Sequence, residues 1–443
     1  MKSSTFHPTT GTKNQQEITL MDPSAELLAE ANRCVACGLC LPHCPTYRLT
    51  LSEADSPRGR IALMSGVANA RIPMNARYVQ HMDRCLTCRA CERVCPNNVA
   101  YGRLIDQART MIQANVQARA ANDGGEGRSR QGRLRHFLER VLIAHPARFD
   151  MLRPFVRLVI KSRLLAMLLR LNILKKHALI QSQWFLTRRH LPGHFWRTSY
   201  PAKGRPRGAV ALFLGCVTRV IDMETLLSAL TVLNRLGYTV HVPRAQTCCG
   251  ALYQHAGLAD EAAALARRNH QAFAGLDIQA ILSTASGCGA QLVDVAAQSP
   301  AHATAVPVMD IHQFLAGQDW SGIHFAPLQR KVAVHEACTL RNVLRASNHL
   351  YPLLARVPGL EIQALAGNDQ CCGAAGTYYL DQPEFANALL DDKLQAIEQA
   401  NPDYLVTANV GCALHMANGL LKEGKNIEVL HPVTLLARQM RIL

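Results

Sequence analysis

Short, continuous apolar runs recur along the second half of the chain, and each is followed closely by small or polar residues. The first three lie at Ala209 to Leu214, Thr239 to Val242 and Ala280 to Leu282. Between the last two, the stretch DEAAALARRNHQAFAG is typical of a helix. Continuous apolar runs that end at turn residues indicate strands buried on both faces. The pattern therefore predicts alternating strands and helices around a parallel sheet.

The same pattern occurs a second time, at Lys331 to His335, Glu361 to Leu365 and Tyr404 to Thr407. The segments GAVALFLGCV, TCCGALYQHAG and ILSTASGCGAQL of the first copy correspond to KVAVHEACTL, QCCGAAGTYYL and LVTANVGCALHM of the second. An internal duplication is the simplest explanation of this correspondence. We therefore expect two similar α/β units.

Each copy carries four cysteines near the predicted strand ends, spaced by 32, 1 and 39 residues in one copy and by 33, 1 and 40 in the other. Loops at the carboxyl ends of parallel strands meet in one crevice, so these thiols can come together. A single buried cysteine is usually inert, but a duplicated Cys-Cys-Gly favours a metal site, either an additional cluster or zinc, or a set of redox thiols. These cysteines are Cys216, Cys248, Cys249, Cys288, Cys338, Cys371, Cys372 and Cys412.

The other eight cysteines form two motifs of the form C-x2-C-x2-C-x3-C-P, in RCVACGLCLPHCPTY at residues 33–47 and in RCLTCRACERVCPNN at residues 84–98. This is the spacing of two-cluster [4Fe-4S] ferredoxins, in which the fourth cysteine of each motif ligates the other cluster. The expected ligands are Cys34, Cys37, Cys40 and Cys95 for cluster 1, and Cys85, Cys88, Cys91 and Cys44 for cluster 2.

Two other interpretations of these motifs are less suitable. Zinc sites usually place an intervening loop between two C-x2-C pairs, which these motifs do not have. Disulfides would suit a secreted chain, but residues 1–30 lack the features of a signal peptide. No run of 18 uncharged apolar residues occurs, so we expect no transmembrane helix.

The net charge of +16 is concentrated in one stretch of the chain. Between Arg128 and Arg207, nineteen Lys or Arg face two acidic residues, which leaves the remainder near neutral at −1. Polar and Gly-rich residues precede this stretch, and YPAKGRPRG ends it. The expected domains are a helical two-cluster domain at 22–115, a basic helical linker at 116–207, and the two cysteine-rich repeats at 208–325 and 326–443.

The basic stretch also raises the question of partners. Leu158, Leu165, Leu169 and Ile173 fall on one side of a helix and basic residues on roughly the other half, which predicts attachment to an anionic membrane surface or to an acidic partner. A nucleic-acid-binding protein is a weaker alternative, because no DNA- or RNA-binding motif occurs. We therefore expect a cytoplasmic protein, with peripheral contact at the inner face of the cell membrane and no nucleic-acid partner.

A two-cluster ferredoxin domain followed by duplicated CCG units resembles the heterodisulfide reductase-type and glycolate oxidase-type iron-sulfur subunits. The segments CPTY, SPRGRIALM, CCGAAGTYYL and TANVGCALH are most similar to the family of glycolate oxidase iron-sulfur subunits. Relatives that hold a noncubane cluster end each repeat with CxxC, whereas Ala285 and Asn409 replace the first cysteine of that pair here.

The resemblance implies an electron-transfer subunit of an oxidoreductase complex, which is not catalytic towards the substrate alone. It also implies a flavin-containing 2-hydroxy acid oxidase partner and a quinone or another carrier as acceptor. The chain itself has no Gly-x-Gly-x-x-Gly fingerprint for a dinucleotide, so a relay is favoured over direct oxidation. The alternative is a heterodisulfide reductase-like or glycerol-3-phosphate dehydrogenase-type subunit that reduces quinone or disulfide at the repeats.

Two further sites are weaker candidates. His335 aligns with a histidine of the family, but a histidine at a strand end is more often structural. The segment Arg58, Gly59 and Arg60 could place guanidinium donors near a cluster, whose sulfurs accept hydrogen bonds that tune its potential, or it could simply begin a helix.

Overall fold

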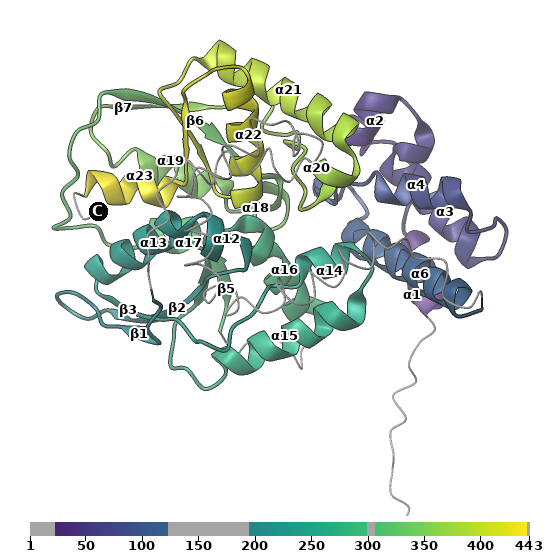
Figure 1. Ribbon diagram of the computed structural model, residues 1–443, viewed down its shortest axis with the longest axis horizontal. Coiled ribbons are helices and arrows are strands. Elements are labelled where there is room, and N and C mark those ends of the chain that lie inside the picture. The colour runs from purple at the N-terminus through teal and green to yellow at the C-terminus, as the bar shows by residue number, and fades with distance from the viewer. Residues whose placement is uncertain (1–22, 123–194, 299–305, 441–443) are drawn as a thin grey trace, which may run out of the picture.

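The computed structural model describes residues 23–122, 195–298 and 306–440, which form a helical unit and two α/β units (Figure 1). The greater part of the basic stretch, including the predicted amphipathic segment at Leu158 to Ile173, lies outside the described residues.

The helical unit consists of short helices joined by the two cysteine loops. Pro45 and Pro57 begin two of these helices at a position where proline costs no hydrogen bond. The helices are α1 (Pro23–Ala31), α2 (Pro45–Thr50), α3 (Pro57–Ala68), α4 (Ala76–Asp83), α5 (Ala90–Arg93) and α6 (Tyr101–Asn122), with a 3₁₀ turn at Glu53–Asp55.

The first α/β unit contains a five-stranded sheet of order β1-β3-β2-β4-β5, parallel except for β1. Its strands are β1 (Ser199–Tyr200), β2 (Gly208–Phe213), β3 (Tyr238–His241), β4 (Ile281–Ser283) and β5 (Val308–Asp310). Its helices are α12 (Val217–Ile221), α13 (Met223–Arg235), α14 (Ala251–His255), α15 (Ala259–Phe273), α16 (Ser286–Gln298) and α17 (Ile311–Ala316).

The second α/β unit repeats this plan with a four-stranded parallel sheet of order β7-β6-β8-β9. Its strands are β6 (Arg330–His335), β7 (Leu360–Ala364), β8 (Tyr404–Thr407) and β9 (Glu428–Leu430). Its helices are α18 (Cys338–Asn342), α19 (Leu350–Leu354), α20 (Tyr378–Asp381), α21 (Pro383–Ala400), α22 (Val410–Lys422) and α23 (Pro432–Gln439), with a 3₁₀ turn at Ser347–His349.

The six strands predicted from the apolar runs are confirmed, and so is their parallel arrangement. The pattern did not predict β1, β5 and β9, which are two or three residues long. The short β1 pairs antiparallel with β3, so residues preceding position 208 already contribute to the first sheet.

The two repeats pack against each other as a pseudo-symmetric pair. Helix α13 of the first packs on α23 of the second, and α17 of the first packs on α19 of the second. Backbone contacts join the two central sheets, because the Ser286 amide donates to the Ala408 carbonyl at 3.0 Å. One continuous apolar core runs through both units.

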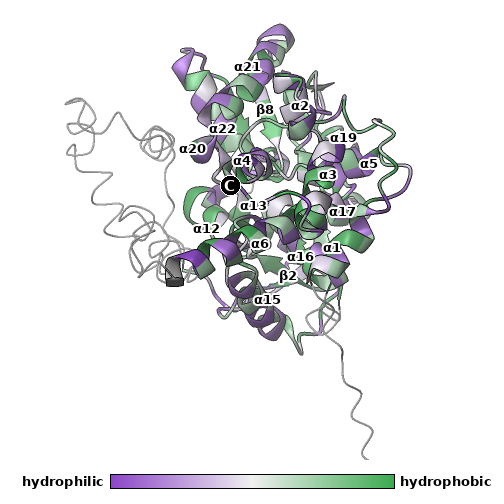
Figure 2. Ribbon diagram, turned by 90° about the vertical axis from the view of Figure 1, so that its right-hand side faces the viewer, coloured by the Kyte–Doolittle hydropathy of each residue, from purple (hydrophilic) through white to green (hydrophobic). Residues whose placement is uncertain are grey.

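The helical unit lies against both repeats, with α2 beside α21 and α6 beside α14 (Figure 1). Figure 2 shows hydrophobic residues on a central strand, as at β8, and hydrophilic residues along the outer helices α15 and α21. Among the described residues, no helix combines the length and apolar character needed to cross a membrane.

Candidate functional site

The two cysteine loops of the helical unit have the same backbone conformation. Ala36 and Gly38 of the first loop have φ of 55° and 85°, and Thr87 and Arg89 at the matching positions of the second have φ of 52° and 57°. Left-handed backbone is unfavourable for non-glycine residues by about 1–2 kcal/mol each. Its occurrence at equivalent positions in both loops is typical of a conformation required by a site.

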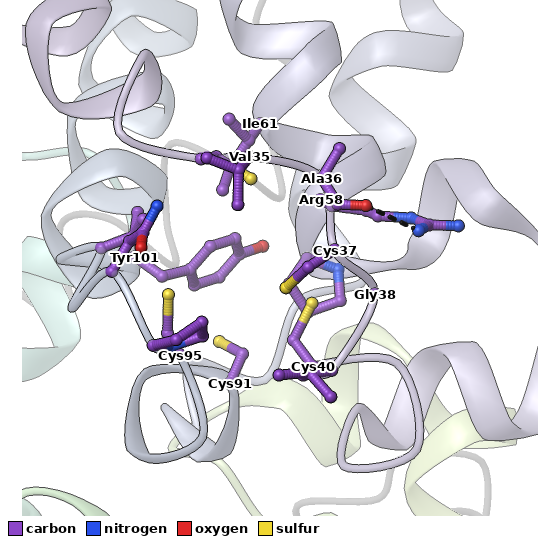
Figure 3. A pocket seen from close by; sticks show the side chains of 16 residues that line it. Val35, Ala36, Cys37, Gly38, Cys40, Arg58, Ile61, Cys91, Cys95 and Tyr101 are labelled. Atoms are coloured by element: carbon purple, nitrogen blue, oxygen red, sulfur yellow. Dashed lines mark hydrogen bonds between the residues drawn. The ribbon is translucent and has the colours of Figure 1, made fainter.

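We call Cys34, Cys37, Cys40 and Cys95 the outer set of thiols. The first loop forms one wall of the cavity that they line. All four line the same apolar cavity, together with Cys91. Figure 3 shows the sulfur atoms of Cys37, Cys40, Cys91 and Cys95 around this space, beside the Tyr101 ring. Cys37 is exposed, and its neighbours Val35 and Leu39 are 66% and 56% exposed. The outer set therefore lies at the protein surface.

The inner set consists of Cys44, Cys85, Cys88 and Cys91, all of which are buried. Burial raises the pKa of the Cys91 thiol, and the nearby thiols of Cys88, Cys85 and Cys44 raise it further. Four unpaired thiols in one another's electrostatic field, without a disulfide, suit a metal cluster that takes thiolate ligands. The four thiols of the outer set and the four thiols of the inner set thus each fit a [4Fe-4S] cluster.

Hydrogen bonds reach the sulfurs of the inner set. The Thr87 amide donates to Cys85 Sγ at 3.4 Å, and the Tyr101 hydroxyl donates to the same sulfur at 3.7 Å. Thr46 Oγ1 lies 3.3 Å from Cys44 Sγ. Donors directed at cluster sulfurs shift reduction potential in iron-sulfur proteins.

A charged network lies beneath Cys44. The buried Asp55 carboxylate pairs with Arg60 at 3.4 Å, with Arg84 at 2.8 Å and with His81 at 2.9 Å. Arg60 is 1% exposed and also donates from Nη2 to Thr46 Oγ1 at 3.1 Å.

The other residues of the SPRGR segment serve different parts of the unit. Arg58 pairs with Glu53 and donates to the Ala36 carbonyl of the first loop at 2.9 Å. A Cβ at Gly59 would overlap the Glu53 carbonyl oxygen, so glycine is required there for close packing.

A second buried guanidinium also lies close to the inner set. Arg109 of α6 is 8% exposed and donates to the Cys85 carbonyl at 2.7 Å and to Thr87 Oγ1 at 3.0 Å. Within residues 23–122, 195–298 and 306–440, no carboxylate forms an ion pair with it.

The cysteines of the second repeat gather at the carboxyl ends of its strands. Cys338 Sγ lies 4.0 Å from Cys371 Sγ. Ligand atoms of His335, Cys372 and Cys412 all lie within 4.8 Å of one another. His335 Nδ1 is hydrogen-bonded to Thr407 Oγ1 at 2.8 Å, which fixes the ring. Burial, with the charge of a neighbouring lysine, holds the pKa of His335 well below its ordinary value, so the ring is neutral.

That lysine, Lys393 of α21, is 2% exposed and donates to the Gly367 carbonyl. Burial lowers its pKa, an effect that the nearby thiols of Cys372, Cys371 and Cys412 oppose. Four thiols, an imidazole and a buried ammonium thus share one pocket, a composition that suits an anionic thiolate centre.

The first repeat differs in its charges. Phe213 replaces the histidine in the aligned sequence, and the neutral Asn269 supports the Cys248 loop by donating to the Cys248 carbonyl at 2.8 Å. Cys216 Sγ lies 3.3 Å from Cys248 Sγ. Donation from Cys216 lowers the pKa of the Cys248 thiol and raises that of Cys216. Cys249 and Cys288 complete the four thiols. Hydrogen bonding to Cys248, and secondarily to Cys288, raises the pKa of the Cys249 thiol.

The inner set lies beside the second repeat. Burial raises the pKa of the Cys88 thiol, and the next largest cause is the nearby thiol of Cys338. Asn342 Nδ2 donates to the Cys88 carbonyl at 2.8 Å. An apolar cluster that includes Leu86 and Phe385 surrounds this contact.

Sequence reasoning missed the polar residues that support the inner set and the second repeat. The signal that could have revealed Lys393 and Arg109 was a charge within an apolar helical face. Leu389, Leu390, Leu394 and Ile397 are buried around Lys393, as are Leu104, Ile105, Ala108 and Ile112 around Arg109. Thr46 and Asn342 carry no comparable signal in the sequence.

Comparisons with known proteins agree with this organisation. The family model for the cysteine-rich domain matches residues 210–293 and 332–417, and that for the 4Fe-4S dicluster domain matches residues 30–99. These ranges contain both repeats and both N-terminal motifs. The prediction of two [4Fe-4S] clusters is confirmed, while the ligands of each stay a prediction.

Curated relatives match most of the chain. It is 33% identical over 414 residues to the probable glycolate oxidase iron-sulfur subunit of Bacillus subtilis, covering 89% of this chain and 90% of that protein. It is 30% identical over 409 residues to the glycolate oxidase iron-sulfur subunit of Escherichia coli, covering 87% and 89%. One subunit of the fumarate reductase (CoM/CoB) of Methanothermobacter marburgensis is 31% identical over 219 residues, covering 49% and 44%.

Proposed function

Because the chain belongs to the family of glycolate oxidase iron-sulfur subunits, we propose that it relays electrons from a flavin subunit that oxidises glycolate or a similar 2-hydroxy acid. The final acceptor is a quinone or another carrier. Each of its two clusters carries one electron at a time, so the two electrons of the oxidation pass singly from the flavin towards an acceptor bound elsewhere.

Within this proposal, Cys34, Cys37, Cys40 and Cys95 ligate the outer cluster, and Cys44, Cys85, Cys88 and Cys91 ligate the inner cluster. The assignment is supported by the spacing of the motifs and by the cavity that all four outer thiols line. Cys91 lines that cavity too, but its electrostatic neighbours are the other three inner thiols.

The observation that carries the proposal is the order of the thiol sets. The outer set includes the exposed Cys37, the inner set is buried, and the inner set adjoins Cys338 of the second repeat. A relay needs one redox group at the surface and others in line behind it. The thiol sets of this chain lie in that order. The sequence also has no recognisable fingerprint for a dinucleotide cofactor.

We also propose that the second repeat binds a thiolate-ligated metal, zinc or an additional cluster, through its four cysteines and His335. Neutral imidazole and thiolate are ligands that zinc and iron share. The second repeat would then receive electrons from the inner cluster if it holds iron, and would be a structural site if it holds zinc.

Reconstitution with a flavin subunit tests the relay. The isolated chain should not oxidise glycolate with any artificial acceptor, and adding the flavin subunit should restore dye reduction. Substituting Cys91→Ser should leave the flavin reducible by substrate while blocking electron passage to quinone, as followed by stopped-flow absorbance. Turnover of a 2-hydroxy acid by the flavin-free chain would contradict the relay.

The second candidate is catalysis at the repeats, as reduction of quinone or a disulfide. The close pair Cys216 and Cys248 is the observation that favours it. Iron content separates the two, because clusters in the repeats would raise it well above the eight per chain expected of two [4Fe-4S] clusters.

Peripheral attachment to the inner face of the cell membrane, through the basic stretch between Arg128 and Arg207, completes the proposal. It is supported by the excess of positive charge there, since each Lys or Arg near an anionic surface contributes about 1 kcal/mol. Flotation with anionic liposomes at low salt tests it, and failure to bind would leave an acidic partner protein.

A further inference from the structure

Two buried guanidinium groups, those of Arg60 and Arg109, lie close to the inner set of thiols. The Thr46 hydroxyl, which donates to the Asp55 carbonyl, lies between Arg60 and Cys44, at 3.1 Å from Arg60 Nη2 and 3.3 Å from Cys44 Sγ. The electrostatic partners of Arg60 include Cys85 and Cys44. Arg109 donates to the Cys85 carbonyl at 2.7 Å.

Carboxylates neutralise these charges only in part. Asp55 is shared by Arg60, Arg84 and His81, so two guanidinium groups face one carboxylate. Arg109 forms no ion pair in the described part of the chain, although it is close enough to Asp83 to act on that carboxyl group electrostatically. Glu92, whose charge acts on Cys91, is paired with Arg89. The incompletely paired charges of Arg60 and Arg109 therefore remain beside the inner set.

The outer set has a different environment. Its nearest guanidinium, Arg58, is neutralised by Glu53 at 2.7 Å, and the two side chains are 32% and 50% exposed. Solvent screens an exposed pair of this kind, so it contributes little to the field at the thiols.

Reduction adds one negative charge to a thiolate-bound cluster, and a buried cation stabilises that charge more than an exposed one does. Burial alone acts in the opposite direction, because loss of water penalises the more highly charged reduced state. Without the arginines, the buried inner cluster would therefore be the harder one to reduce.

Resting on the ligand assignment proposed above, we infer that Arg60 and Arg109 raise the reduction potential of the inner cluster above that of the outer cluster. The two arginines are positioning residues that favour retention of an electron at the inner set, next to the second repeat.

Redox titration of the intact chain, monitored by electron paramagnetic resonance, tests this inference. Arg109→Gln should shift the midpoint of the inner cluster to more negative potential and leave the outer midpoint unchanged. Arg109→Lys, which keeps the charge, should restore most of the potential. Cys37→Ser, which removes the outer cluster, identifies the inner signal.

Arg103→Gln is the matched control, because Arg103 lies on the same helix with its side chain 42% exposed. It should move neither midpoint. Arg60→Gln, the direct test of the other arginine, could fail to fold because Arg60 is buried. Thr46→Val retains both arginines and removes only the hydroxyl between Arg60 and Cys44, so it should shift the inner midpoint to more negative potential by less than Arg109→Gln does.

The outcomes separate this inference from the proposed function. Two assembled clusters whose midpoints do not respond to Arg109→Gln and Thr46→Val would overturn the inference alone, as would an equal shift of both midpoints. An unsubstituted chain without two cluster signals would overturn the ligand assignment on which it rests.

Discussion

Asn342 Nδ2 donates a hydrogen bond to the backbone carbonyl of Cys88 at 2.8 Å, joining residues that are 254 positions apart. Cys88 belongs to the second cysteine loop, and Asn342 ends helix α18, which begins at Cys338. One side chain thus fixes the distance between the inner thiols and those of the second repeat.

Substituting Asn342→Leu should destabilise the protein by about 1–3 kcal/mol, because the buried Cys88 carbonyl would lose its partner. Urea unfolding under anaerobic conditions measures this change. Asn69→Leu is the matched control, since Asn69 is exposed and donates only to Ser65 of its own helix. An exposed change of this kind should stay within about 0.5 kcal/mol. Equal losses in both variants would contradict the importance of the buried contact.

Anaerobically prepared protein should contain about eight irons from the two ferredoxin motifs. Cys37→Ser and Cys88→Ser should each remove the signal of one cluster, because each cysteine belongs to a different set. Electron paramagnetic resonance of the variants checks the assignment. A single three- or four-iron centre in the unsubstituted protein would show that the two motifs do not hold separate clusters.

The glycines of the two Cys-Cys-Gly segments should differ in their tolerance of alanine. Gly250 and Gly373 both have left-handed backbone, with φ of 91° and 87°, so either substitution should cost about 1–2 kcal/mol in strain. A Cβ at Gly373 would also lie 2.5 Å from the Ala386 carbonyl, whereas at Gly250 the corresponding contact, with Ala262, is 3.3 Å.

We therefore expect Gly373→Ala to displace α21 and to lower the thermal midpoint more than Gly250→Ala does. Differential scanning calorimetry of both variants checks the order. The reverse order would mean that α21 moves without cost.

Stability should fall as the pH decreases through about 6.5, with a contribution from His415. Burial lowers the pKa of this imidazole below its ordinary value, against the opposing hydrogen bond to the Ala386 carbonyl. Below pH 6.5 the unfolded chain binds a proton at His415 that the folded chain does not bind, so acid favours unfolding.

His415→Gln should make the unfolding free energy depend less steeply on pH. The effect should occur between pH 7 and the lowered pKa of His415 in the folded protein, and should be at most about 1.4 kcal/mol per pH unit. Urea midpoints at pH 7 and pH 6 measure the slope. An unchanged slope would contradict the buried, neutral state of this residue.

The sequence predicted the sheets and the presence of two clusters because both depend on local pattern. Apolar runs such as Ala280 to Leu282 report burial on both faces, and the ferredoxin spacing is itself the geometry of one loop around a cluster. The short strand β9 was not predicted because its three residues, beginning with Glu428, are too few to give a pattern.

The contacts between units could not be predicted in the same way. Asn342 meets Cys88 only because the helical unit, which contacts both repeats, places α5 and its cysteine loop against α18. That placement depends on complementary surfaces around Leu86 and Phe385, which no periodicity in a single segment reveals. The partners of Arg60 are likewise set by tertiary packing.

The exposure of Cys37 has a consequence for handling the protein in air. Oxidation of cysteine ligands follows their accessibility, and all four inner thiols are at most 9% exposed while Cys37 is open to solvent. Under the proposed ligand assignment, dissolved oxygen therefore meets the outer cluster first. In air, preparations should therefore lose the outer cluster while the inner cluster persists. The time for which the relay survives in air is then limited by the exposure of the first cysteine loop.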